Sequence, residues 1–403
     1  MMVCGVLLLQ HTRNILTRRQ VNMSMRMQRS FILGLETSCD DTGACVMDMN
    51  GKVLGESLST QLSTRLGGVI PTLAMNWHAE KVEGVVMDSM EKAGIGMEDL
   101  SAIAVTNRPG LKGPLIIGTD YAKYLCMKHQ VPMIPIHHME AHALTARMIN
   151  PVKFPFLVLL ISGGHCLLAL ARDIDSYQLL GTSINDSPGE ALDKCSRYLK
   201  LHTLPGMRDL PGGKAVELTA AKAKGMMEVP VPMRSYRDCR FSFAGIKAAI
   251  NDHRLREEKR LGIDPDQVLP MVEEVCAGLQ YSITKHLCER LQRGVEFLHH
   301  KEVEGVNTLV VSGGVASNMY IRQGLDTVAQ HYGMSAVYPP PRLCTDNGVM
   351  IAWNGLERWR EGRGVVRWQE VLEVQVQSRC PLGVDIHQEV ETAAIKCKWI
   401  KLK

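Results

Sequence analysis

Residues 31–60 read FILGLETSCDDTGACVMDMNGKVLGESLST, and this stretch decides the fold. It opens with an apolar strand, Phe31–Glu36, which leads into a turn of small and polar residues at Thr37–Gly43. A second strand, Ala44–Met49, reaches Asn50-Gly51, a dipeptide typical of hairpin turns, and a third strand covers Lys52–Ser59. The stretch therefore predicts a three-stranded meander with a buried first strand.

The same pattern returns later in the chain. Strand Phe156–Ile161 runs into the turn Ser162-Gly163-Gly164, and strands His165–Ala171 and Ser176–Thr182 follow on the two sides of a turn at Arg172–Asp175. Helical stretches and shorter strands come after each meander. The repeat indicates a duplicated α/β domain, although hairpins with glycine turns are common enough to recur by chance.

Apolar residues at helical spacing predict the elements between and after the meanders. The predicted helices are 77–93, 118–129, 189–201, 268–299 with one break, and 349–360. Val229–Phe243 carries prolines and is expected to be irregular. Strand Thr308–Val311 runs into Ser312-Gly313-Gly314 and a helix from about Ser317, an arrangement that presents backbone amides and a helix dipole to an anion.

Length and composition indicate an enzyme with two lobes. At 403 residues the chain exceeds the usual size of one domain, and 45% hydrophobic residues can supply two cores. We predict lobes at residues 31–150 and 151–380 and a frayed basic tail within 381–403. The twelve cysteines include no Cys-x-x-Cys pair, which argues against a zinc ribbon or a disulfide framework and favours a reducing compartment.

The net charge of +4 comes from the N-terminus. Residues 1–30 contain five arginines and no acid; without them 41 basic residues face 42 acidic ones. An arginine-rich, acid-free leader predicts a mitochondrial transit peptide and a matrix location, the alternative being a disordered extension. No segment reads as a membrane span.

His138 and His142 stand four residues apart, so on a helix they share one face and could bind a metal ion. A partly buried helix face without a metal is the alternative. Glu140 lies about 200° around the helix from His138, unlike the acid of a His-Glu-x-x-His zinc protease, so that class is disfavoured. His137 also lies off the shared face and is expected in a supporting or surface position.

Three acids could complete such a site. Asp346, in Thr345-Asp346-Asn347-Gly348, precedes a predicted helix and is either a third metal ligand or a helix N-cap. Asp40 and Asp41 lie in the first turn, where Asp is common in any case. If the two meanders correspond, these acids face the same cleft as the Ser162-Gly163-Gly164 turn and could accept a proton.

Seven ordered motifs resemble those of the tRNA N6-adenosine threonylcarbamoyltransferase family. They are Ile32–Thr42, His138–His142, Ser162–His165, Gly189–Lys194, Phe241–Lys247, Ser312–Asn318 and Thr345–Gly348. The resemblance covers roughly residues 31–360, and with the arginine-rich leader the chain looks like the family's mitochondrial members.

This resemblance implies an actin-like fold of two duplicated lobes, with a nucleotide and metal cleft between them. It implies transfer of threonylcarbamoyl from threonylcarbamoyl-adenylate to N6 of adenosine 37, in tRNAs that read codons beginning with A, with release of AMP. His138, His142 and Asp346 would then hold one divalent metal ion. The residues expected to bind the adenylate are Ile161, Ser162, Gly163, Gly164, His165, Asp193, Gly213, Glu217, Ser317, Asn318 and Thr345.

Several points stay open within this likeness. Asp40 or Asp41 would accept the proton from the adenine amino group. Gly206 competes with Gly213 for the ribose contact, because residues 202–209 depart from the family pattern. The family also implies tRNA and a separate adenylate synthase as partners, and a homodimer.

For tRNA contact the sequence offers one basic and aromatic segment, or equally a solvated loop. Its members are Arg234, Tyr236, Arg237, Arg240, Phe241, Phe243 and Lys247.

Two rival functions exist on the same fold. A metabolite kinase or ATPase would need ATP and has no use for two histidines beside an aspartate. A catalytically silent partner subunit is the second rival, and the retained histidines argue against it.

Overall fold

A computed structural model describes residues 30–61, 69–264 and 266–402. The predicted transit peptide at 1–30 lies outside the described residues except for Ser30. The described chain forms two compact units, and each is taken by itself. The first combines the residues up to His138 with Asp346–Arg379, and the second combines Met139–Thr345 with the residues from Cys380 onward. The predicted lobe boundaries stay predictions.

The sheet of the first unit has the strand order β3-β2-β1-β4-β5. Its strands are β1 (Phe31–Glu36), β2 (Asp41–Asp48), β3 (Val53–Thr60), β4 (Leu100–Arg108) and β5 (Met133–His137). The first three pair antiparallel as the predicted meander, whereas β4 and β5 continue from β1 in parallel. The central strand β1 is buried along nearly its whole length, which explains its unbroken apolar sequence.

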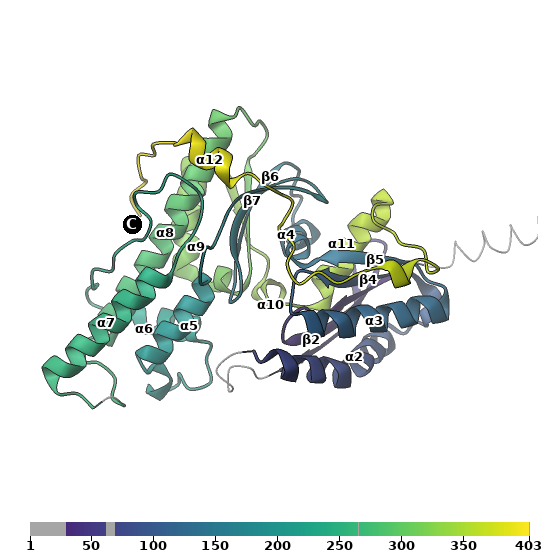
Figure 1. Ribbon diagram of the computed structural model, residues 1–403, viewed down its shortest axis with the longest axis horizontal. Helices are drawn as coiled ribbons and strands as arrows, with labels where there is room; N and C mark the ends of the chain where they lie inside the picture. Colours follow the sequence, from purple (N-terminus) through teal and green to yellow (C-terminus); the bar gives the residue numbers. More distant parts are fainter. Residues whose placement is uncertain (1–29, 62–68, 265, 403) are drawn as a thin grey trace, which may run out of the picture. The chain divides into compact units, whose positions relative to one another are not determined.

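Helices cover both faces of this sheet (Figure 1). On one face lie α2 (Pro71–Ala93) and α3 (Lys112–His129), and on the other lies α11 (Gly348–Glu361). Helix α2 begins at Pro71, where a missing N–H costs nothing, and ends at Gly94, which adopts a left-handed φ of 67°. Helix α11 approaches β1 closely, because a Cβ on Gly34 would lie 2.2 Å from the Ala352 nitrogen.

The second unit repeats this topology, with the strand order β10-β9-β6-β7-β8-β11. Its strands are β6 (Phe156–Ile161), β7 (Cys166–Asp173), β8 (Ser176–Thr182), β9 (Thr308–Ser312), β10 (Ser335–Val337) and β11 (Val384–Asp385). Read from β8 to β10, the order and the parallel or antiparallel sense of each pairing match β3 to β5. The duplication is therefore real, and the prediction of an actin-like α/β fold with two related lobes is confirmed.

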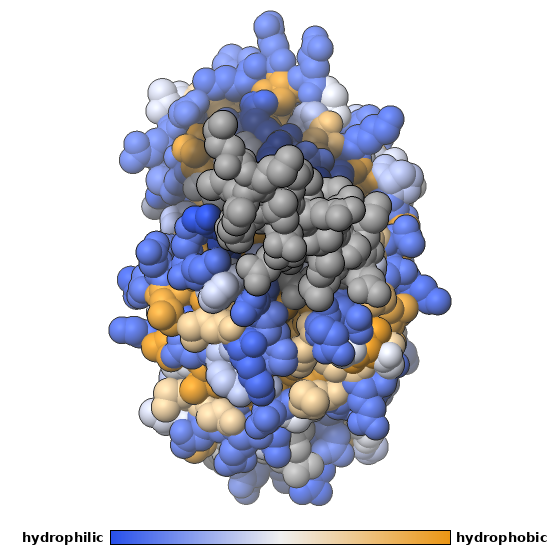
Figure 2. All heavy atoms as spheres, turned by 90° about the vertical axis from the view of Figure 1, so that its right-hand side faces the viewer, coloured by the Kyte–Doolittle hydropathy of each residue, from blue (hydrophilic) through white to orange (hydrophobic). Residues whose placement is uncertain are grey.

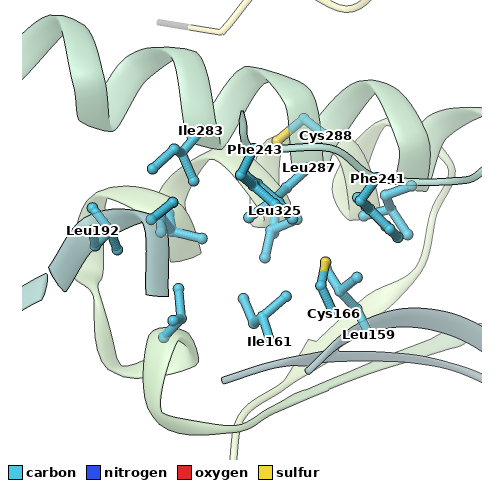
Figure 3. Close-up of a cluster of buried hydrophobic side chains, with 14 of the residues drawn as sticks. Leu159, Ile161, Cys166, Leu192, Phe241, Phe243, Ile283, Leu287, Cys288 and Leu325 are labelled. Carbon is cyan, nitrogen blue, oxygen red and sulfur yellow. The ribbon is translucent and has the colours of Figure 1, made fainter. Parts of the chain in front are cut away.

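The helices of the second unit pack around one long helix, α8 (Val272–His300). Figure 3 shows Ile283 and Leu287 of α8 in one buried cluster with Leu159 and Ile161 of β6. The other helices are α5 (Pro188–Tyr198), α6 (Gly212–Ala220), α7 (Ala244–Leu261), α9 (Met319–His331), α10 (Pro341–Cys344) and α12 (His387–Ala393). The predicted break in α8 is wrong: it runs for 29 residues, and its buried side chains occupy most of its circumference.

The expectation of a frayed C-terminal tail is also wrong. The Gln292 amide bonds to the Lys398 carbonyl and the Ile400 N–H, and Arg293 donates to the Ile395 carbonyl, so the tail lies along α8. Arg293 also lies over the ring of Trp399, 5.2 Å from its centroid. A sequence pattern could not show this, because the contacts come from another part of the chain.

No helix among the described residues is both long enough and apolar enough to span a bilayer. On the visible part of the face drawn in Figure 2, groups of apolar side chains lie between hydrophilic ones. Helices α2 and α3 contribute exposed apolar side chains, among them Met87, Tyr124 and Met127.

Candidate functional site

His138, His142 and Asp346 offer ligand atoms that all lie within 4.8 Å of one another. The two histidines begin the helix α4 (His138–Ile149), one turn apart on the same face, and both are buried. The His138 Nε2 lies 3.5 Å from the Asp346 Oδ1. Two imidazoles and one carboxylate at this spacing fit a divalent transition metal, as the sequence predicted for these three residues.

Asp346 is not the cap of the helix that follows it. The side chain of Asn347 accepts a hydrogen bond from the Met350 N–H and caps α11. The alternative role that the sequence left open for Asp346 therefore belongs to its neighbour. A Cβ on Gly43 would lie 2.7 Å from the Gly348 nitrogen, so the end of the first turn lies against the start of α11.

A buried carboxylate supports His138 from the other side of its ring. Glu36 ends β1 with no exposed surface, and its Oε2 lies 3.2 Å from the His138 Nδ1. Burial disfavours the charged imidazole, but Asp346 and Glu36 outweigh it and raise the pKa of His138 to about 9. Burial would likewise raise the pKa of Glu36, and His138 holds it below its usual range.

Asp40 and Asp41 lie in the first turn, and Asp41 already begins strand β2. The turn is therefore shorter than predicted. Burial, together with the negative charges of Asp346 and Asp40, raises the pKa of Asp41 to about 7 against an opposing hydrogen bond from Thr60. Its Oδ1 is buried and accepts no hydrogen bond from any described residue. A carboxyl with this pKa exchanges protons near neutral pH.

A buried histidine of helix α2, His78, forms hydrogen bonds to the turn between β1 and β2. The Nε2 of His78 lies 3.0 Å from the Cys39 carbonyl, and its Nδ1 lies 2.7 Å from the Thr42 hydroxyl. A carbonyl can only accept, so Nε2 carries the proton and Nδ1 accepts from Thr42. Burial lowers the pKa of His78, in agreement with a neutral ring.

In the second unit, the predicted Ser162-Gly163-Gly164 turn follows β6 directly. The Ser162 Oγ accepts the Gly164 and His165 N–H groups at 3.3 and 3.0 Å. The Ser187 hydroxyl donates to the Gly163 carbonyl, and the Gly189 N–H donates to the Ser162 carbonyl. The start of α5 thus holds the turn, while a Cβ on Gly163 or Gly164 would meet no atom within 4 Å. The turn is open on its outer side.

Hydrogen bonds join the other residues predicted to bind the adenylate. The Asp193 Oδ1 accepts the Gly213 N–H at 3.2 Å, and the Glu217 Oε1 accepts the Met319 N–H at 2.8 Å. These contacts bring α5, α6 and the start of α9 together. Burial raises the pKa of Asp193, with the Gly213 N–H opposing it. Asn318 caps α9 through the Ile321 N–H, which gives it a structural task besides any ligand contact.

The set also includes Ile161, Ser317 and Thr345. Gly313 contacts the Ile161 carbonyl so closely that a Cβ would lie 2.4 Å from its oxygen. Ser317 ends the short 3-10 helix Gly314–Ser317, which leads into Asn318 and α9, whereas Thr345 follows α10. A hollow of about 380 Å³ opens beside Glu217, with Ala220, Met226, Gln280 and Tyr320 in its wall.

The family model for tRNA N6-adenosine threonylcarbamoyltransferase matches residues 52–353. The chain belongs to this family. It is 45% identical to the mitochondrial tRNA N6-adenosine threonylcarbamoyltransferase of Danio rerio, with 92% of this chain and 93% of that protein covered. The human mitochondrial protein of the same name is 42% identical, with coverage of 92% and 91%.

Family membership confirms a tRNA-modifying transferase, and the mitochondrial location predicted from the leader is confirmed by these relatives. A transferase of the same name from Anaplasma phagocytophilum is 40% identical over 83% of this chain and 94% of its own length. Among solved structures, HypF of T. kodakarensis aligns with a TM-score of 0.49 at 14% identity, covering 86% of this chain and 49% of that one.

The structure corrects the predicted RNA-binding segment of this threonylcarbamoyltransferase. Phe241 and Phe243 are fully buried and pack against the ring of His286, so they cannot stack on a base (Figure 3). Arg240 pairs with Asp238, and Lys247 pairs with Asp186. The exposed remainder of the segment is the stretch 234–237.

Two residues of the site were missed at the sequence level, Glu36 and His78. Glu36 could have been noticed, because a charged residue at the end of a wholly apolar strand must find a partner when the strand is buried. His78 gave no such signal, since one histidine on a helix is ordinary. His137 ends β5 and is buried, so the expectation that it is a surface residue is wrong, and a supporting role stays a prediction.

Proposed function

We propose that this chain transfers the threonylcarbamoyl group of threonylcarbamoyl-adenylate to N6 of adenosine 37, in mitochondrial tRNAs that read codons beginning with A. The adenine amino nitrogen attacks the carbamoyl carbon. The bond from that carbon to the phosphate oxygen breaks, AMP leaves, and the attacking nitrogen loses a proton. Because the donor is a mixed anhydride with a good leaving group, the reaction needs no serine or cysteine nucleophile.

The observation that carries the proposal is the cluster of His138, His142 and Asp346, whose ligand atoms lie within 4.8 Å of one another in a chain of this family. For the base, burial raises the pKa of Asp41 to about 7. A base for an amine attack must be unprotonated at working pH and must hold the proton that it takes, and a pKa near 7 serves both needs. Asp41 is therefore our choice over Asp40 for the proton acceptor. His78 holds the turn that carries it.

His138, His142 and Asp346 would hold one divalent metal ion per subunit. Imidazole and carboxylate donors favour iron, zinc or manganese over calcium or magnesium. When bound, such an ion acts as a Lewis acid toward a carbonyl or phosphate oxygen of the donor.

The second unit supplies residues suited to the adenylate. Asp193 and Glu217 can accept paired hydroxyl hydrogen bonds from a ribose. The hollow beside Glu217, with apolar Ala220 and Met226 and the amide of Gln280, suits a purine ring. The open glycine turn at Gly163-Gly164 would serve the phosphate if the Ser162 hydroxyl gives up its two amide hydrogen bonds.

Partners follow from the reaction. The donor adenylate would come from a separate synthase, and tRNA would be the acceptor. We also propose a homodimer, which the exposed Met87, Tyr124 and Met127 of α2 and α3 support. Sedimentation equilibrium should give about twice the mass of the chain, and a monomer at micromolar concentration would contradict the dimer.

The test is a single-turnover reaction of the purified protein with threonylcarbamoyl-adenylate and unmodified mitochondrial tRNA, read by mass spectrometry of the nucleosides. We expect N6-threonylcarbamoyladenosine from the wild type and a loss of at least about 100-fold for Asp41→Asn. Asp120→Asn, on the exposed side of α3, is the matched control for removing one carboxylate.

Absence of the modified nucleoside, where a known relative makes it, would refute the transfer and favour a silent subunit. Hydrolysis of ATP without transfer would favour the kinase or ATPase alternative. Transfer undiminished in Asp41→Asn but lost in Asp40→Asn would move the base to Asp40.

A further inference from the structure

We propose that Glu36 is a positioning residue, which fixes the ring of His138 with its proton on Nδ1 so that Nε2 faces the metal position. The inference rests on the metal site of the proposed function and extends it to a residue outside the ligand set. Glu36, Ser38, Thr106 and His138 all belong to the first compact unit.

Glu36 is held on both of its oxygens. Its Oε1 accepts the Ser38 backbone N–H at 2.5 Å, and its Oε2 accepts the Thr106 hydroxyl at 2.5 Å from the neighbouring strand β4. A fully buried carboxylate without such donors would be costly, so these contacts keep its place at the end of β1 fixed. A rigid carboxylate can set the orientation of a neighbouring ring.

The ring of His138 lies between two carboxylates. Its Nδ1 lies 3.2 Å from the Glu36 Oε2 and 3.1 Å from the Ser38 Oγ, and its Nε2 lies 3.5 Å from the Asp346 Oδ1. With both oxygens already accepting, Glu36 presents an acceptor to Nδ1, and Nδ1 must supply the proton. Of the two ring nitrogens, Nε2 beside Asp346 is then the one that can give up its proton and offer a lone pair to a metal ion.

This arrangement has a functional consequence. An imidazole ligand whose far nitrogen donates to a carboxylate is oriented, locked in one tautomer and made more basic, and losing that partner typically weakens metal binding by about 10- to 100-fold. Glu36 would therefore set the metal affinity of a site that it does not touch.

Glu36→Gln tests the assignment with nearly unchanged shape. The amide offers one acceptor and one donor where the carboxylate offered two acceptors. Facing an NH₂ group, Nδ1 would become the acceptor and Nε2 would take the proton, which blocks the metal. Thr106→Val is the matched control, since it removes another partner of the same Oε2 and leaves His138 untouched.

Two measurements decide. Competition of the apoprotein with a chromogenic chelator for Zn²⁺ alone should show about 10- to 100-fold weaker binding for Glu36→Gln and less than about threefold for Thr106→Val. In metal-free protein labelled with ¹⁵N-histidine, at a pH above the pKa of about 9 of His138, where the ring is neutral, the His138 signal, assigned by its loss in His138→Gln, should show a protonated Nδ1 and lose this preference in Glu36→Gln.

Equal Zn²⁺ affinity of Glu36→Gln and wild type, or an Nε2–H tautomer of His138 in the wild type, would overturn the proposal. The NMR measurement on the wild type, assigned with His138→Gln, does not need Glu36→Gln, so it decides even if Glu36→Gln fails to fold. Neither readout uses tRNA or the adenylate. A wild type that binds no Zn²⁺, Fe²⁺ or Mn²⁺ would instead refute the metal assignment of the proposed function.

Discussion

At the scale of single residues, ionisation of the partly buried Asp41 carboxyl lowers the stability of the folded protein. The folded state raises its pKa from 3.8 to about 7, so between these values the folded chain holds a proton that the unfolded chain releases. Stability is therefore lost as the pH rises through this range. Asp41→Asn should raise the free energy of unfolding at pH 8 by about 1–2 kcal/mol, after discounting for partial exposure, and should change it little at pH 4.

Thermal melts of wild type, Asp41→Asn and the control Asp120→Asn at both pH values check this. A gain for Asp41→Asn that is as large at pH 4 as at pH 8 would show that ionisation of Asp41 is not its cause.

The same residue predicts how transfer depends on pH. If Asp41 takes the proton, the single-turnover rate should rise with pH and level off above about pH 7, because only the ionised carboxylate can accept. The profile is measured with saturating adenylate and tRNA. A profile that stays flat between pH 5.5 and 8.5, in a step shown to be chemical, would assign the proton to another group.

The sequence could supply the three residues proposed to bind a metal ion but not the residues that support them. The spacing of His138 and His142 guarantees one helix face, whereas the partnership of Asp346 depended on a contact across about two hundred residues. Asp346 and Asn347 are adjacent and both residue types are common helix N-caps, and in the structure Asn347 caps α11. Glu36 acquired its role only when β1 and α4 came together.

At the scale of elements, the turn between β1 and β2 depends on α2. His78 bonds to both ends of this turn, at Cys39 and Thr42, so its loss should free the backbone that carries Asp41. We expect His78→Ala to lower stability by about 2–4 kcal/mol through the cavity and the two lost hydrogen bonds. Single-turnover transfer at a temperature where the variant is folded should fall at least about tenfold.

His78→Gln is the partial control, because its amide can still donate to the Cys39 carbonyl. It should recover part of the transfer rate lost in His78→Ala. If folded His78→Ala transfers at the wild-type rate, the contact from α2 serves stability alone.

Elements were predictable where the apolar residues form a short unbroken run between turn residues or a clear period. Strands β1 to β3 and β6 to β8 and the body of α2 agree with the sequence prediction to within a few residues. Helix α7 was missed, because among its 18 residues only Ile246, Ile250 and Glu258 are buried and charged side chains dominate the rest. The break predicted within α8 was wrong for the opposite reason. Because α8 is buried on most sides, its apolar residues show no clear helical period.

At the scale of the whole molecule, the two sheets share one topology but their units are not consecutive halves of the chain. Asp346–Arg379 lies between β10 and β11 of the second sheet in sequence and belongs to the first unit. Helix α11 covers the face of the first sheet opposite α2 and α3, and it brings Asp346 with it. The sequence repeat predicted the duplication, but it could not show that the segment Asp346–Arg379 packs in the first unit.

Helix α11 can pack closely on strand β1 because Gly34 of β1 has no side chain, and a final prediction concerns this glycine. A Cβ on Gly34 would lie 2.2 Å from the Ala352 nitrogen and 2.6 Å from the Gly348 carbonyl oxygen, and neither backbone atom can move alone. Gly34→Ala should therefore cost about 3 kcal/mol or more of stability, by overpacking between β1 and α11. It should also weaken Zn²⁺ binding, because α11 and Asp346 shift together.

Gly84→Ala is the matched control, the same substitution on exposed α2 where a Cβ meets no atom within 4 Å. It should stabilise by about 0.5–1 kcal/mol, since alanine loses less backbone entropy in a helix. Urea unfolding of both variants, with Zn²⁺ titration of the folded proteins, measures the contrast. If Gly34→Ala proves as stable as Gly84→Ala, then α11 does not pack on β1 at the described distance, and the placement of Asp346 beside His138 loses its structural basis.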